Sequence, residues 1–94
     1  MATSISTGVL TTSGLVFTGK NRVNALTVLT DGTNSATVEV YDNTSASGTK
    51  RVVGKCVGAN LIQHIIFDNP VLFENGLYVS ITGTGATTIL FFGG

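Results

Sequence analysis

The chain has 94 residues, the size of a single domain, and we expect one domain over residues 1–94. Charged residues make up only 11%, against about 25% in an average domain. The five basic and five acidic residues cancel, which argues against nucleic-acid binding, and the single cysteine excludes an intramolecular disulfide.

The chain is typical of a protein built from many short strands. No segment has the apolar spacing of a helix, and β-branched residues are interrupted at short intervals by Gly, Asn, Asp and Ser. In chain order we expect strands over residues 5–10, 15–18, 22–29, 37–41, 51–57, 61–67, 71–73, 77–82 and 87–92. We expect turns between them at 31–35, 68–70, 74–76 and 83–86. Eight or nine strands at this spacing predict an all-β fold, a compact single-domain antiparallel β-sandwich or jelly roll of about eight short strands.

One stretch, VEVYDNTSASGTK over residues 38–50, combines a strand with a long polar loop. We expect Asp42 and Asn43 to cap the turn through nearby backbone amides, and Gly48 to supply a positive φ. The loop, residues 43–49, is longer than a minimal hairpin needs, so we interpret it as a contact to a neighbouring protein. Its candidate contact residues are Asp42, Asn43, Thr44 and Ser45.

The sequence ends in TTILFFGG, which places four large apolar residues in a row. A strand with apolar residues on both faces is typical of one that is covered on both sides. One cover would be the core of this domain, and the other a neighbouring subunit. We therefore expect a homo-oligomer, with a trimer as one form, and take three further residues as candidate contacts: Leu90, Phe91 and Phe92.

Catalytic and metal-binding patterns are weak. His64, the only histidine, lies in an apolar strand, and we interpret it as a partly buried strand residue that makes one hydrogen bond. Cys56 is interpreted as a buried, inert thiol, because it and Lys55 would point to opposite faces of a strand. The acids lie mostly at turns, without the converging oxygen ligands that calcium needs. We expect no enzyme, no metal and no cofactor.

Two further observations concern surroundings and ligands. The first residues, MATSISTGVL, lack a basic segment and a long apolar core, so we expect no secretion signal. The apolar runs are too short to span a bilayer, and no membrane contact is expected. Tyr41 and Tyr78 should share the outward side of their strands, which leaves a sugar-binding platform open as an alternative.

Several short motifs between residues 22 and 92 occur in an order that resembles a group of small tailed-phage virion proteins. The motifs are Tyr41-Asp42-Asn43, Gly48-Thr49, Phe67, Pro70, Asn75-Gly76-Leu77-Tyr78-Val79, Thr82-Gly83 and Ala86-Thr87-Thr88. The resemblance implies a small β-sandwich in the virion, assembled in the cytoplasm of a bacterial host. It implies a decoration (cement) protein on the head, with the major capsid protein or another virion protein as partner. A fiber, tail or neck component that binds a carbohydrate or receptor, or acts as an adaptor, is the alternative.

Overall fold

The computed structural model describes residues 5–93, so that residues 1–4 and 94 of the expected domain lie outside the described part. Within residues 5–93 there are eight strands, one short 3-10 helix and no α-helix. The elements are β1 (Ile5–Ser6), β2 (Gly14–Thr18), β3 (Asn21–Leu29), β4 (Ala36–Tyr41), β5 (Lys50–Cys56), η1 (Gly58–Asn60), β6 (Ile62–Phe73), β7 (Gly76–Thr82) and β8 (Thr87–Phe92). The expected all-β fold is confirmed.

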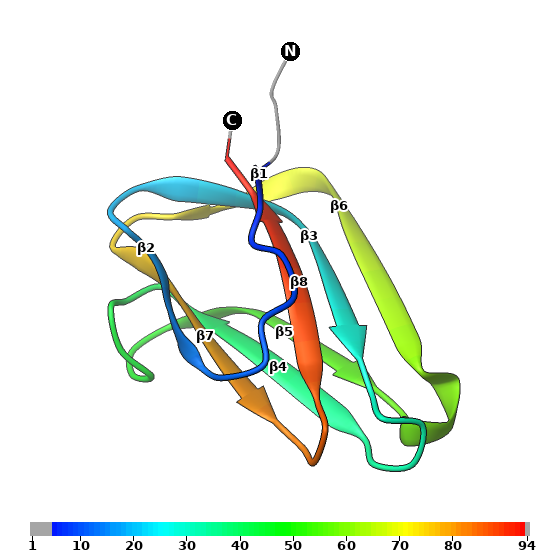
Figure 1. Ribbon diagram of the computed structural model, residues 1–94. Helices are drawn as coiled ribbons and strands as arrows, with labels where there is room; N and C mark the ends of the chain where they lie inside the picture. Colours follow the sequence, from blue (N-terminus) through cyan, green and yellow to red (C-terminus); the bar gives the residue numbers. More distant parts are fainter. Residues whose placement is uncertain (1–4, 94) are drawn as a thin grey trace.

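The strands form two four-stranded antiparallel sheets packed face to face (Figure 1). Sheet A has the order β1-β8-β3-β6 and sheet B the order β2-β7-β4-β5. The first strand thus pairs with the eighth, the second with the seventh, the third with the sixth and the fourth with the fifth. The chain is arranged as one long hairpin with its tip at the β4–β5 loop. Successive strand pairs of this hairpin lie alternately in sheet A and sheet B. This is the arrangement of a jelly roll, and the expected sandwich is confirmed.

The core lies between the two sheets and follows from strand alternation. In β4, Val38 and Val40 are fully buried, while Glu39 between them is on the outer side. Leu77 and Val79 of β7 are buried in the same way. The largest fully buried apolar side chains are Phe73, Leu26, Leu77, Leu90, Val23, Val28, Val38, Val40, Val79 and Cys56. These side chains come from six strands, so burial of their apolar surface holds the two sheets together.

The turn expected at residues 68–70 is wrong, because these residues are part of the twelve-residue strand β6. Along β3 the pairing jumps from Val23 opposite Val71 to Ala25 opposite Ile66. Residues 67–70 therefore bulge out opposite one residue of β3. Pro70 is tolerated because β6 is an edge strand, where a missing N–H breaks no inner ladder. The separate strand expected at 71–73 is the end of β6.

The strand expected at residues 5–10 is interrupted. Only Ile5–Ser6 forms β1, which pairs with the end of β8. Gly8 has a φ of +72°, which extended strands do not adopt, and the chain rejoins β8 at Leu10 opposite Thr88. This edge of sheet A is therefore made of two short contacts separated by a kink.

Candidate protein-contact site

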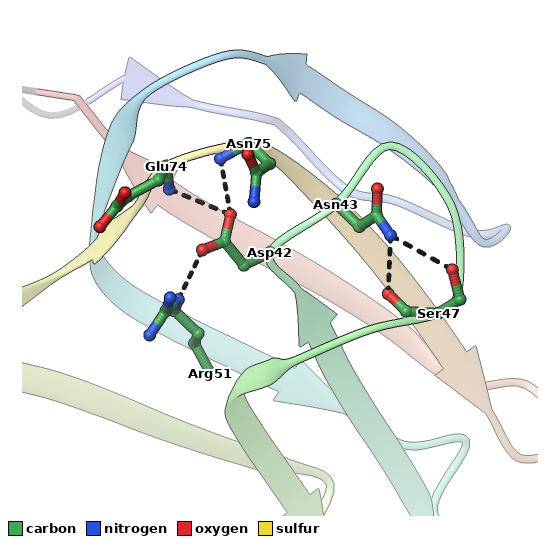
Figure 2. Close-up of polar contacts among 6 residues, drawn as sticks. All are labelled: Asp42, Asn43, Ser47, Arg51, Glu74 and Asn75. Atoms are coloured by element: carbon green, nitrogen blue, oxygen red, sulfur yellow. Dashed lines mark hydrogen bonds and ion pairs between the residues drawn. The ribbon is translucent and has the colours of Figure 1, made fainter.

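The loop between β4 and β5 begins at Asp42, whose side chain points into the protein and is 2% exposed. Its Oδ1 accepts hydrogen bonds from the backbone N–H groups of Glu74 (3.0 Å) and Asn75 (2.7 Å). Its Oδ2 accepts one from the Nε of Arg51 at 2.6 Å. Figure 2 shows these three donors converging on the carboxylate. Asp42 thus ties the β4–β5 loop to the turn between β6 and β7.

The charge of Asp42 is stabilised by these donors. Burial by itself would raise the pKa of the carboxyl group. The hydrogen bond from the Asn75 backbone, the guanidinium of Arg51 and the Glu74 backbone oppose this effect, and the pKa lies below its ordinary value. Asp42 is therefore an ionised structural residue with all its polar contacts inside the chain. A role as a contact residue for another protein does not fit this geometry.

Asn43 caps the loop locally, as its residue type predicts. Its side-chain amide donates to the backbone oxygen of Ser47 (3.1 Å) and to the Ser47 hydroxyl (3.2 Å), as drawn in Figure 2. Its own oxygen accepts from the N–H of Thr44. Gly48 has a φ of +84°, as expected for the end of this turn. Thr44 and Ser45 lie exposed at the tip, so of the four candidate contact residues in this region they are the two that a partner could touch.

The three candidate residues of β8 lie on two different sides. Leu90 is fully buried and Phe92 is 8% exposed, and both side chains belong to the core between the sheets. Phe91 between them points outward and is half-buried. A partner can therefore reach Phe91 directly, whereas Leu90 and Phe92 serve the interior of this chain.

Phe91 belongs to a surface that we call the outer face of sheet A. It consists of the outward side chains of β3 from Ala25 on, of β6 as far as Ile66 and of β8, which are Ala25, Thr27, Leu29, Ile62, His64, Ile66, Thr87, Ile89 and Phe91. Beyond the bulge of β6 the same side continues with the charged Arg22 and with Leu72, which we do not count as part of this surface. None of these nine residues is charged. A sandwich whose outer faces both meet water normally shows polar residues at such positions. The outer face of sheet A therefore has the composition of a covered surface.

The centre of this face is organised around His64. Its Nδ1 and the hydroxyl of Thr27 share a hydrogen bond of 2.6 Å. Its ring meets Phe91 edge-on, with 6.1 Å between ring centroids. A shallow hollow lies beside them, lined by Asn24, Ala25, His64, Ile66, Phe67 and Phe91. The aromatic and aliphatic side chains of the face thus form one connected apolar area with few polar atoms.

The outer face of sheet B is different. Glu39 of β4 pairs with the ammonium group of Lys50 at 2.7 Å, and the exposed Lys55 follows on β5. Tyr41 lies opposite Tyr78 on this face, and the expectation that both point to the outward side of their strands is confirmed. Both rings are half-buried, and the Lys50 ammonium lies 5.9 Å from the Tyr41 centroid. The two faces of the sandwich therefore offer contrasting surfaces, one uncharged and one charged.

His64 and Cys56 do not approach one another as a catalytic pair would. Cys56 points into the core from β5 and is 1% exposed, as expected of a buried thiol. His64 points away from the core on the other sheet and is exposed, where partial burial was expected. Among residues 5–93, no three His, Cys, Asp or Glu side chains gather as a metal site would require. No helix in the described part of the chain is long and apolar enough to cross a membrane.

Sequence reasoning found Phe91 but missed the residues around it. The signal was present in LIQHIIF, residues 61–67, an uncharged run with isoleucines at both odd and even positions. Such a run resembles the C-terminal strand, where the same feature did suggest a cover on both sides. Comparisons with protein-family models, with curated proteins and with solved structures found no match to this chain.

Proposed function

We propose that this chain is a structural protein of a bacteriophage virion, a decoration (cement) protein that binds the outer surface of the head. It would stabilise the shell as a homo-oligomer, with the major capsid protein or another virion protein as its partner. The observation that carries the proposal is the outer face of sheet A, which is uncharged and apolar across three strands. Its place would be the virion, assembled in the cytoplasm of a bacterial host.

The physical basis of binding would be burial of this face against the shell. Apolar surface removed from water contributes about 25 cal/mol per Å². Because the face carries no Asp, Glu, Lys or Arg side chain that would lose its hydration, little of this free energy would be lost to desolvation of charged groups. Many copies on one shell would strengthen attachment further, because each bound copy holds its linked neighbours close to their own sites. Jelly rolls occur in viral capsid proteins and in lectins, so the fold is compatible with the proposal without deciding it.

The alternative, a fiber, tail or neck component that binds a carbohydrate, would use Tyr41 and Tyr78 beside a free carboxylate. The nearest acid of the loop, Asp42, is buried and already accepts three hydrogen bonds. Both tyrosine side chains are half-buried. The uncharged face therefore supports the head-binding proposal better than the tyrosine pair supports sugar binding.

The proposal is tested by sedimenting the protein with purified heads that lack it. The informative variant is Phe91→Ser, and the matched control is Tyr78→Ser, which removes a half-buried ring from the other sheet. We expect Phe91→Ser to weaken binding to heads at least tenfold, or about 1.4 kcal/mol, and Tyr78→Ser to leave it unchanged. Circular dichroism shows whether both variants are folded. Equal binding by both variants, or wild-type protein that stays in the supernatant, would contradict the proposal.

A further inference from the structure

The strand β6 forms a long open edge of sheet A, at the right of Figure 1. Its neighbour on one side is β3, and no strand of residues 5–93 pairs with its other side. Unpaired N–H and C=O groups along such an edge are a template for pairing with another chain. Only part of β6 presents these N–H and C=O groups in a regular row without protecting side chains.

The backbone hydrogen bonds identify the outward groups. The N–H of Thr30 donates to the oxygen of Leu61 at 2.7 Å, which continues the β3–β6 ladder by one residue. Because bonded pairs alternate in an antiparallel ladder, Gln63 and Ile65 also direct their backbone groups to β3. Three residues in between then direct their N–H and C=O groups to the open side: Ile62, His64 and Ile66.

Side chains that usually protect an edge are absent from this half of β6. Residues 61–67 contain no charge, no proline and no glycine. One of the two edge strands of sheet B, β5, carries Lys50, Arg51 and Lys55, and charged side chains of this kind discourage pairing. The second half of β6 is protected by its bulge, which contains Asp68 and Pro70. Residues 62–66 are thus the unprotected part of a long edge.

The outward residues also form a palindrome, Ile-x-His-x-Ile, centred on His64. Ile62 and Ile66 are 54% and 69% exposed. In an antiparallel pair of two identical segments, Ile62 would face the partner's Ile66 at both ends, and His64 would face the partner's His64 in the middle. The same surface would meet itself, as a two-fold contact requires.

We propose that two copies of this chain pair antiparallel through Ile62–Ile66, with the two-fold axis between the two His64 residues. The pairing joins the two A sheets into one sheet of eight strands. The axis is perpendicular to that sheet, so both outer faces of sheet A lie on the same side. The inference deepens the proposed function by naming the contact between copies, and rests on it only for the expectation of a homo-oligomer. A two-fold pair replaces the trimer raised from the sequence.

The contact is short compared with standard interfaces, which bury about 1,600 Å². We therefore expect free protein to dimerise with a dissociation constant of roughly micromolar order. Sedimentation equilibrium of free protein, without shells, measures it. Failure of this test and failure of head binding are thus separate results.

The matched variants exchange two exposed aliphatic residues, four positions apart, on each edge strand. Ile62→Lys with Ile66→Lys would place like charges opposite one another across the two-fold axis. The control, Val53→Lys with Val57→Lys, alters residues of similar exposure (57% and 56%) on and just after β5. We expect the first pair of substitutions to weaken dimerisation at least a hundredfold and the control to leave it unchanged. Wild-type protein that is monomeric at several hundred micromolar would overturn the proposal, as would equal dimerisation of both variants.

The register is tested by oxidative cross-linking, since the native Cys56 is buried. Facing residues of a bonded pair have Cα atoms about 5.5 Å apart, within the range of a disulfide. We expect His64→Cys to cross-link into dimers. Ile62→Cys alone should not cross-link, because residue 62 of the second copy would lie about 14 Å further along the strand. Ile62→Cys combined with Ile66→Cys should cross-link, because these two positions face one another. Cross-linking of Ile62→Cys alone, or none with His64→Cys, would overturn the assigned register.

Discussion

The carboxylate of Asp42 is the polar contact on which we expect stability to depend most. It joins the tip of the β4–β5 hairpin to the β6–β7 turn, although the two segments are more than 30 residues apart in the chain. Asp42→Ala would remove the acceptor and leave the N–H groups of Glu74 and Asn75 without their partner. It would also leave Arg51 without its counter-charge.

The size of the effect follows from the three contacts. Hydrogen bonds to a charged group contribute about 1.5–3 kcal/mol each, and both backbone bonds to Asp42 are of this kind. The side chain of Arg51 is 38% exposed, so its ion pair is screened by water and adds about 1 kcal/mol at most. These contributions add to about 3–7 kcal/mol. Because Glu74 and Asn75 are exposed, water can replace part of what is lost, and we expect Asp42→Ala to lower the free energy of unfolding by about 3–5 kcal/mol. That is a large share of the roughly 5–15 kcal/mol that hold a domain folded.

Urea unfolding followed by circular dichroism measures this loss. The matched control is Asp31→Ala, since Asp31 also accepts three hydrogen bonds, from the N–H groups of Thr33 and Asn34 and from the Asn34 side chain. Asp31 is exposed, so water can replace its contacts, and its removal should be clearly less damaging. If Asp42→Ala destabilises the protein no more than Asp31→Ala does, the reasoning on burial is refuted.

Two more predictions follow from the same region. The pKa of Asp42 is lowered in the folded state, so its ionised carboxylate contributes fully to the free energy of unfolding above the ordinary pKa, and this contribution is lost as the pH falls through the lowered value. The free energy of unfolding of Asp42→Asn should therefore depend less on pH below about 4 than that of the wild type. Urea unfolding at each pH measures this difference. Gly76→Ala should destabilise the protein by about 2–4 kcal/mol, because a Cβ there would lie 2.7 Å from a backbone oxygen of the β4–β5 loop. Gly14→Ala, where nothing lies within 4 Å, is the control, and equal thermal melting of the two variants would contradict this packing.

The sequence predicted the strands well because alternation and turn chemistry are local. Most expected strands lie within one residue of the observed ones, and the turn expected at 31–35 is present, with Asp31 accepting a hydrogen bond from the N–H of Thr33. The error at residues 68–70 arose because Asn-Pro usually marks a turn, whereas an edge strand tolerates it as a bulge. The pairing of the first strand with the eighth could not be read from local patterns, since only folding brings such distant segments together.

The candidate site was predicted less completely than the fold. Asp42 looked like a local turn residue, but its partners lie at Glu74 and Asn75, and only the fold brings them close. The C-terminal strand was correctly interpreted as apolar on both sides, yet which side meets the core depends on register with β3. A one-residue slip would exchange Phe91 with its neighbours. The exposed apolar residues of β6 likewise indicate a contact surface only because the fold places this strand at an edge of sheet A.

An electron-microscopy map of the virion shows directly whether the outer face of sheet A binds the shell, as we propose. We expect density for the eight-stranded sandwich on the head, with Phe91 and Ile89 against the shell and the charged face of sheet B toward solvent. Density on the tail or fibers, or a sandwich that rests on the shell through Glu39 and Tyr78, would contradict it.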